Sequence, residues 1–252
     1  MYFRIALRYE EKFMNQFMKM GLKITGVLAG VFLGYCALPN LYARNVSKRV
    51  RKTLPKGKNQ VALTFDDGPN AEYTGRVLDI LKKYQVKATF FIVIKNANQN
   101  LDLIERMKAE GHEIAFHSYK HQSAWELPPW ATLKEIQKGE DELDAQNIEF
   151  HYVRPPWGTF NLFTLFGMLR RNLQVILWSV EAYDWRKRQT SEKIAEIILN
   201  RVEDGSIIVL HDSGGAKGAP EHTIGSLELW IPELIKKGYH FVTISEGIKM
   251  LR

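Results

Sequence analysis

Val61-Ala-Leu-Thr-Phe-Asp-Asp-Gly-Pro69 decides the fold, because a short apolar run ends there in two adjacent acids and a turn signal. β-branched and aromatic residues favour a buried strand, and Gly-Pro favours a turn directly after it. Similar runs follow along the chain, separated by stretches with apolar residues three and four positions apart, which is typical of amphipathic helices. The predicted strands are Val61–Phe65, Ala88–Val93, Glu113–Phe116, His151–Val153, Val175–Leu177, Ser206–Leu210 and His240–Val242. The predicted helices are Tyr73–Tyr84, Leu101–Glu110, Leu133–Gln146, Leu162–Arg171, Ser191–Arg201 and Leu227–Lys237.

This alternation of strands and helices predicts parallel strands joined by helical crossovers. Seven such units in roughly 190 residues fall short of an eight-stranded barrel, which usually takes about 250. The sequence therefore predicts an α/β fold, a distorted (β/α)7 barrel of parallel strands with an N-terminal membrane-anchor helix. An open doubly wound sheet is the alternative. No Gly-x-Gly-x-x-Gly follows the first strand, so a dinucleotide site has no support.

The composition is that of a globular protein, with 45% hydrophobic and 25% charged residues among 252. Cys36 is the only cysteine, so the fold has no internal disulfide. The net charge of +7 is unevenly distributed, because residues 1–60 hold 12 of the 35 Lys and Arg but only two of the 28 Asp and Glu. The basic excess therefore lies outside the predicted domain, and we expect no nucleic-acid partner. No feature of the sequence indicates an oligomeric state.

The N-terminal region contains a charge-free run, Ile24–Leu38, that is typical of a signal segment or a short membrane anchor. The run extends through Ala43 to about 20 residues and lacks a clean small-residue cleavage pattern, so we favour an anchor over cleavage. A buried core helix is the alternative. The predicted organisation is a signal or anchor segment at 1–43, a basic linker at 44–60 and a domain at 61–252. We expect this domain outside the cytoplasmic membrane, or secreted if the segment is cleaved, although the basic residues after the run argue against export.

Reactive side chains follow five of the predicted strands, at the edge where barrels and open parallel sheets bind their ligands. Two histidines four residues apart can face the same way if a helical turn begins there, and with one carboxylate they make a three-ligand site open to water. Neighbouring acids at a strand end point in different directions, so one can bind metal while the other stays a free base. These side chains are Asp66 and Asp67, His117 and His121, Arg154, Asp184, and His211 and Asp212.

Five motifs carry a resemblance to a known family: Thr64-Phe-Asp-Asp-Gly-Pro69, His117-Ser-x-x-His121, Arg154-Pro-Pro-Trp-Gly158, Asp184-Trp185 and Ile208-Val-Leu-His211. In this order they resemble the motifs of the polysaccharide deacetylases, also called the NodB-homology family or carbohydrate esterase family 4. The resemblance covers nearly all of residues 61–252. It implies a metal-dependent hydrolase that removes N-acetyl groups from amino sugars of an envelope polysaccharide, such as peptidoglycan or a chitin-like glycan.

The resemblance also implies a role for each reactive group. Asp67, His117 and His121 would hold a divalent metal, usually Zn²⁺, with Co²⁺ and Ni²⁺ as alternatives. Asp66 would be the general base that activates water. His211 would be the general acid that protonates the departing amine, which leaves poorly as an anion.

Further residues would support this chemistry. Arg154 would pair with the base and Asp184 with the acid, and each would hold its partner charged and oriented. The backbone N–H of Trp157 would stabilise the oxyanion. Trp185 and Leu210 would wall a pocket for the acetyl methyl group, although such residues more often belong to the core.

Two departures from the family pattern leave the substrate open. Trp157 stands where a tyrosine is more usual, and an aromatic, proline-containing loop, Gln122–Trp130, follows His121. This loop could stack on a sugar, meet a lipid or pack on the barrel, and it weakly resembles deformylases of lipid-linked aminoarabinose. One alternative function is therefore deacylation of a lipid-linked amino sugar at the membrane surface. A catalytically silent glycan-binding module is a less favoured alternative, since none of the expected reactive residues is missing.

Overall fold

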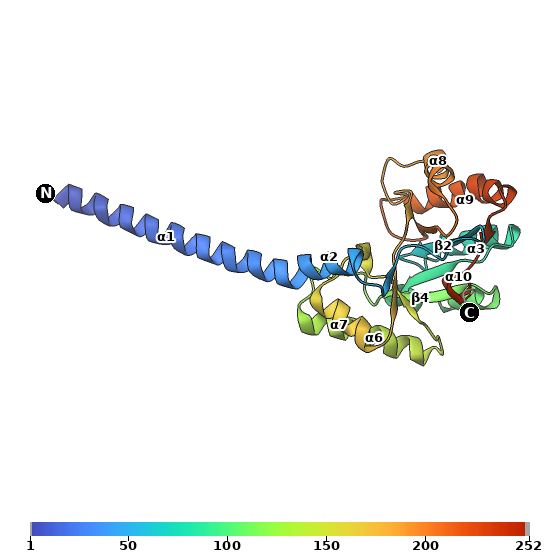
Figure 1. The fold of residues 1–252 in the computed structure, drawn as a ribbon, viewed down its shortest axis with the longest axis horizontal. Helices are drawn as coiled ribbons and strands as arrows, with labels where there is room; N and C mark the ends of the chain where they lie inside the picture. The colour runs from blue at the N-terminus through green and yellow to red at the C-terminus, as the bar shows by residue number, and fades with distance from the viewer. Residues whose placement is uncertain (1, 250–252) are drawn as a thin grey trace.

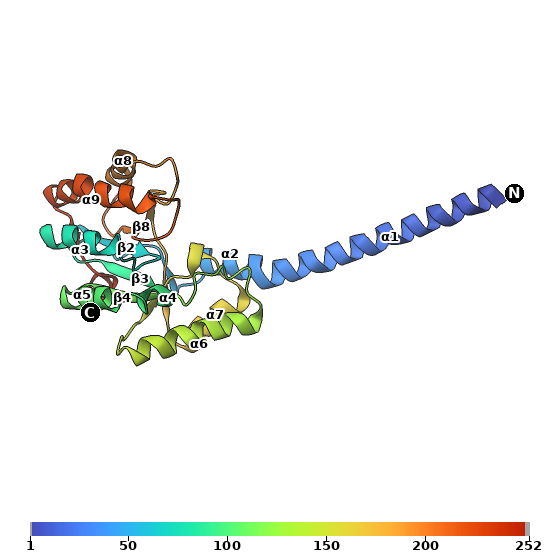
Figure 2. The same ribbon diagram turned by 180° about the vertical axis from the view of Figure 1, so that it is seen from behind.

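The computed structural model describes the backbone of residues 2–249 and the side chains of residues 12–249. A long N-terminal rod projects from an α/β domain, as Figures 1 and 2 show from opposite sides. The rod consists of α1 (Tyr2–Phe32), one π-helical turn η1 (Leu33–Ala37) and α2 (Leu38–Asn45). By length and composition alone, its segment Lys12–Asn45 could cross a membrane. The predicted anchor segment is thus helical, and its last turns lie against the domain.

The domain is built on a parallel sheet in the order β1-β6-β5-β4-β3-β2-β8-β7, with β9 paired separately to β2. The two edge strands, β1 and β7, do not pair with each other in the described residues, so the barrel is incomplete. This confirms the predicted parallel α/β fold of distorted-barrel type. The strands are β1 (Val50–Arg51), β2 (Gln60–Asp66), β3 (Thr89–Val93), β4 (Glu113–Ser118), β5 (Tyr152–Val153), β6 (Gln174–Ile176), β7 (Val180–Glu181), β8 (Ile207–His211) and β9 (His240–Phe241).

Helices connect the strands, and each of the six predicted helices is present. Two of them begin earlier than predicted, at Pro129 and Ala219, because proline is tolerated in a first helical turn, where its missing N–H costs nothing. The helices are α3 (Thr74–Lys83), α4 (Ile94–Ala97), α5 (Leu101–Ala109), α6 (Pro129–Ala145), α7 (Leu162–Arg170), α8 (Ser191–Arg201), α9 (Ala219–Lys236) and α10 (Ile244–Lys249), with a short 3₁₀ turn η2 (Pro156–Gly158).

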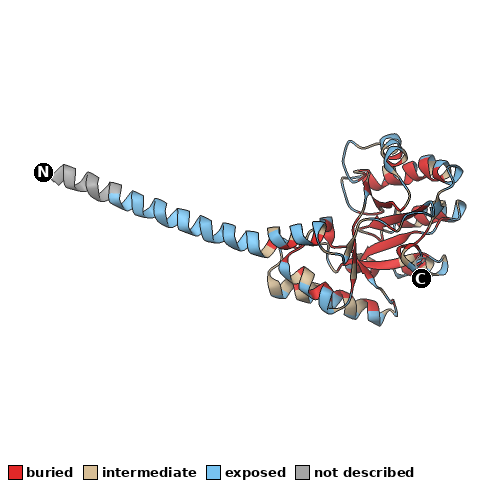
Figure 3. Ribbon diagram, viewed as in Figure 1, coloured by how far each residue is buried: buried red, intermediate tan, exposed pale blue. Residues whose placement is uncertain are grey.

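The hydrophobic core lies on both faces of the sheet, and Figure 3 shows the central strands as almost wholly buried. Alternate residues of β2 enter two separate apolar clusters: Leu63 and Phe65 pack in the larger one, and Ala62 packs in the smaller. Phe65 also stacks on Phe90, with ring centroids 5.2 Å apart. Burial on both faces fixes the register of β2, whose carboxyl end carries the adjacent acids.

The structure differs from two details of the predicted organisation. Residues 44–60, the predicted linker, are partly built into the domain, because Val50 pairs with Val175 and Leu54 is only 3% exposed. The apolar residues of this basic stretch thus complete the sheet edge and the smaller core cluster. The last predicted strand also lies off the barrel path, since β9 pairs only with the start of β2.

Candidate metal centre

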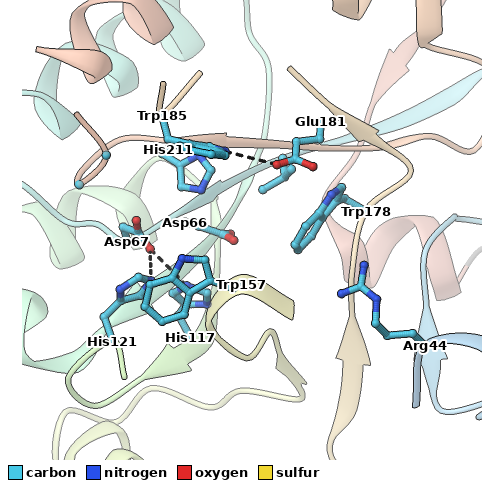
Figure 4. Close-up of a pocket in the computed structure, with 13 residues that line it drawn as sticks. Arg44, Asp66, Asp67, His117, His121, Trp157, Trp178, Glu181, Trp185 and His211 are labelled. Atoms are coloured by element: carbon cyan, nitrogen blue, oxygen red, sulfur yellow. Dashed lines mark hydrogen bonds and ion pairs between the residues drawn. The ribbon is translucent and has the colours of Figure 1, made fainter. Parts of the chain in front are cut away.

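A cavity of about 560 Å³ opens at the carboxyl ends of the strands, and Figure 4 shows the side chains that line it. Asp66 and His211 stand beside each other there, because they are register partners at the ends of β2 and β8. Register partners on adjacent parallel strands point to the same face. The predicted acid and base therefore share one rim.

Asp67, His117 and His121 form a compact three-residue cluster in this cavity. Oδ1 of Asp67 lies 3.2 Å from Nε2 of His117 and 2.9 Å from Nε2 of His121. Oδ1 is buried and has no well-directed hydrogen bond, so its acceptor capacity is unmet. One carboxylate and two imidazoles are a donor set that suits Zn²⁺ and related divalent ions. The cluster therefore fits a divalent metal.

The charge states within the cluster favour metal ligands. Burial would raise the pKa of the Asp67 carboxyl, but the adjacent imidazoles of His117 and His121 lower it well below its usual range. Nδ1 of His117 lies 2.6 Å from the backbone oxygen of Arg154. Donation of the Nδ1 proton to this oxygen leaves Nε2 free to bind a metal on the side that faces Asp67.

The two histidines meet through a bend, which corrects the prediction of a helical turn after β4. His117 lies within the strand, and the chain bends at Tyr119 and Lys120 before it reaches His121. His121 has a left-handed backbone conformation with φ 56°, and its N–H donates to Oγ of Ser118 at 2.7 Å. This bend brings the two imidazole centroids within 5.2 Å of each other.

Asp66 is paired with Arg154, as predicted, and the pair is deeply buried. Nη1 of Arg154 lies 2.6 Å from Oδ1 of Asp66, and the two side chains are 0% and 5% exposed. The remaining guanidinium donors reach Oγ1 of Thr64 and the backbone oxygens of Ile176 and Leu177. The guanidinium therefore has no freedom to turn, and it holds the Asp66 carboxylate in one orientation.

His211 and Asp184 form the second predicted pair. Nδ1 of His211 lies 2.9 Å from Oδ1 of Asp184, which is fully buried. Asp184 also accepts hydrogen bonds from the His211 backbone N–H at 2.7 Å and from Oγ1 of Thr223 at 2.8 Å. Burial alone would lower the pKa of His211, but the Asp184 carboxylate, with smaller contributions from Asp67 and Asp66, raises it to about 10. The imidazole is therefore protonated at neutral pH and can act as an acid.

Asp212 is a buried acid that the sequence interpretation left without a role. Its side chain is 0% exposed and accepts a hydrogen bond from Oγ1 of Thr74 at 2.5 Å. Burial raises its pKa to about 7. The carboxylate lies against Gly68, where any Cβ would collide with it, so this turn requires glycine. Asp212 thus supports the turn that carries the acids of β2.

The aromatic residues agree only in part with the predicted acetyl pocket. Trp157 is 57% exposed, and its ring lies 4.5 Å from that of His121. Trp185 lines the cavity, as predicted. Leu210, however, is fully buried in the main core, and Val209 lines the cavity instead. The prediction for Leu210 is wrong because neighbouring residues of a strand face opposite sides, and Val209 shares the face of His211.

Three other side chains line the cavity without having been predicted, those of Arg44, Trp178 and Glu181, and Gly214 and Gly215 complete the lining. Arg44 comes from α2, at the end of the N-terminal rod, and its Nη1 donates to the backbone oxygen of Gly158 at 2.8 Å. Glu181 accepts a hydrogen bond from Nε1 of Trp185 at 3.3 Å. In the sequence, Arg44 is one basic residue among several that flank the apolar run, so no signal distinguishes it.

Comparison with known proteins reveals clear relatives. The family model described as polysaccharide deacetylase matches residues 53–175. A peptidoglycan-N-acetylglucosamine deacetylase of Bacillus cereus is 35% identical over 191 residues, which is 75% of this chain and 68% of the relative. A peptidoglycan-N-acetylmuramic acid deacetylase of Bacillus subtilis is 34% identical, over 74% of this chain and 70% of the relative. A crystal structure of a peptidoglycan N-acetylglucosamine deacetylase superposes with a TM-score of 0.74 and 32% identity, over 80% of this chain and 93% of that one.

Proposed function

The chain belongs to the polysaccharide deacetylase family, and from this premise we propose that it hydrolyses N-acetyl groups of amino sugars in an envelope glycan. The observation that carries the proposal is that Asp66 and His211, each paired from behind with a buried residue of opposite charge, line one cavity together with a three-residue cluster of possible metal ligands. Amide hydrolysis needs a base, an acid and stabilisation of an oxyanion. The cavity offers a candidate for each.

Asp67, His117 and His121 would hold the metal, with Zn²⁺ as the first candidate. When bound, a divalent metal supplies Lewis acidity to an acetyl carbonyl and lowers the pKa of water. The protein supplies the geometry, because the three donor atoms lie within 4.8 Å of one another.

Asp66 would take the proton of the attacking water. Its ion pair with Arg154 keeps the carboxylate oriented. The guanidinium is itself fixed in place, because it donates hydrogen bonds to four acceptors. Asp66 is thus the natural proton acceptor of the site.

His211 would protonate the departing amine from the neighbouring strand. The Asp184 carboxylate helps to raise the pKa of the imidazole to about 10, so His211 carries its proton at neutral pH. The backbone N–H of Trp157 would donate to the developing oxyanion, and Val209 and Trp185 would enclose the acetyl methyl group. Val209 takes over the role expected of Leu210.

We propose peptidoglycan as the substrate, because the two relatives above are named for its glucosamine and muramic acid residues. The N-terminal helix would anchor the enzyme in the cytoplasmic membrane with the domain outside. Deacylation of a lipid-linked amino sugar is the second candidate, favoured by the exposed Trp125 and Trp130 in the loop after His121. A catalytically silent module is disfavoured, because the cavity keeps the base, the acid and the donor cluster together.

The test measures the metal content of the full-length protein in detergent, together with acetate release from N-acetylglucosamine oligomers before and after chelation. We expect stoichiometric metal and chelator-sensitive acetate release. His121→Ala should lose both, whereas the exposed neighbour variant Gln122→Ala should keep both. A folded protein that binds no metal would refute the catalytic proposal. A protein that binds metal but releases no acetate would favour the second candidate, deacylation of a lipid-linked amino sugar.

A further inference from the structure

The N-terminal rod is docked on the domain over its last turns. The Phe32 ring packs edge-on against Trp125, with centroids 5.6 Å apart. The Tyr35 hydroxyl donates to the backbone oxygen of Leu127 at 2.7 Å, and its ring lies 6.3 Å from Phe163. Cys36, Pro39 and Ala43 are buried against the domain. The helix therefore continues into the domain without a flexible linker.

The charge-free part of the helix that stands clear of the domain is too short to cross a bilayer alone. The charge-free segment 24–43 spans about 30 Å, which matches the hydrocarbon thickness of a membrane. Within it, residues 24–34 are all exposed, but these eleven residues span only about 16 Å. Burial against the domain begins at Tyr35. If the charge-free segment 24–43 is the part that crosses the hydrocarbon, the domain surface beside the helix must enter the membrane interface.

That surface carries large apolar side chains that remain exposed to solvent. Trp125, Trp130, Leu162 and Phe166 are 43%, 74%, 49% and 50% exposed, and we call them the apolar rim. They flank the docking point, because Tyr35 contacts Leu127, between the two tryptophans, and the Phe163 ring, next to Leu162. Figures 1 and 2 show α1 leaving the domain beside α7. Tryptophan is enriched at membrane–water interfaces, where its amphipathic ring is favoured.

We propose that the apolar rim sits in the interfacial layer of the bilayer that the N-terminal helix crosses, and that it fixes the catalytic cavity at the membrane surface. The proposal rests on the anchor of the proposed function. Arg44 lines the cavity and lies ten residues beyond Gly34, about 15 Å along the helix axis. The enzyme would therefore act on amino-sugar glycan that lies at or is attached to the membrane, not on distant wall layers.

The test uses full-length protein in liposomes, with single cysteines labelled by an environment-sensitive fluorophore in a Cys36→Ser background. Trp130→Cys and Leu162→Cys report the rim, and Val27→Cys reports the exposed anchor helix. Leu229→Cys, 44% exposed on α9, is the matched control. Each labelled protein is exposed to a lipid-borne quencher and to aqueous iodide.

We expect lipid-borne quenching and protection from iodide at positions 27, 130 and 162, and the reverse at position 229. If the label at 27 is quenched from the lipid but the labels at 130 and 162 behave like the one at 229, the apolar rim does not lie in the interfacial layer. This result would overturn the inference and leave the proposed anchor intact. Absence of lipid quenching at position 27 would overturn both the anchor and this inference. Acetate release from soluble oligomers tests the hydrolase independently of each result.

Discussion

Replacement of Asp184 by asparagine should lower the activity of the enzyme at alkaline pH, because this carboxylate keeps His211 protonated. Burial would lower the pKa of His211, but the Asp184 carboxylate, with smaller contributions from Asp67 and Asp66, raises it from 6.5 to about 10. The amide keeps the shape and can still accept from Thr223, but it lacks the charge. The pKa of His211 should then fall toward its ordinary value of about 6.5. At pH 8.5 the protonated fraction, and with it kcat/KM, should drop by up to about 100-fold relative to wild type.

The same substitution should change the pH dependence of stability. A histidine whose pKa is raised on folding stabilises the protein fully below about pH 6.5, and this contribution is lost as the pH rises through about 10. A shift of this size corresponds to on the order of 5 kcal/mol in the free energy of unfolding. In urea unfolding between pH 6.5 and 10, the free energy of unfolding of Asp184→Asn should therefore fall less with rising pH than that of the wild type.

A control variant separates the charge of Asp184 from its hydrogen bonding. Thr223→Val removes only the hydroxyl that donates to Asp184 at 2.8 Å and leaves the carboxylate in place. Its kcat/KM profile for N-acetylglucosamine oligomers should keep the wild-type alkaline limb. An Asp184→Asn enzyme with that same alkaline limb would show that His211 is not the acid, or that Asp184 does not set its pKa.

Three further substitutions test other parts of the structure. Asp66→Asn should keep the metal, measured by elemental analysis, and lower the rate of acetate release by about 10²–10⁴-fold, as loss of a general base does; an unchanged rate would contradict the assignment. Arg44→Ala removes the donor to Gly158, and we expect KM to rise by about tenfold, the loss of roughly 1.4 kcal/mol, with unchanged metal content. Phe65→Ala empties a fully buried core position, so urea unfolding should report about 3–5 kcal/mol less stability, and a loss below 1 kcal/mol would contradict the packing described.

The regular part of the fold was predictable from sequence because each long element has its own hydrophobic period. β2, for example, is an apolar run bounded by turn residues, and it lies where its pattern predicts. β1 and β7 contain two residues each, too few to show any period. Their positions follow instead from pairing with β6 and β8, which no local pattern reveals.

The candidate site was predictable where a side chain directly ends a strand, and unpredictable where a distant segment supplies it. Asp66 and His211 end strands, and the parallel sheet brings them together. Arg44 reaches the cavity because α2 docks beside Gly158, 114 residues later in the sequence. Leu210 was misplaced for a simpler reason: residue type suggested a pocket wall, but strand alternation decides which side chain faces the cavity.

The two buried pairs explain how one small cavity keeps a base and an acid ready at the same pH. Side by side, an unsupported carboxylate and imidazolium would form an ion pair and neutralise each other's chemistry. Here Arg154 engages Asp66 at 2.6 Å and Asp184 engages His211 at 2.9 Å, each from behind and out of the solvent. Low polarity strengthens both attractions, and breaking either pair would leave an uncompensated buried charge. The supporting residues therefore belong to the core as much as to the site, and their loss should change charge states before it changes shape.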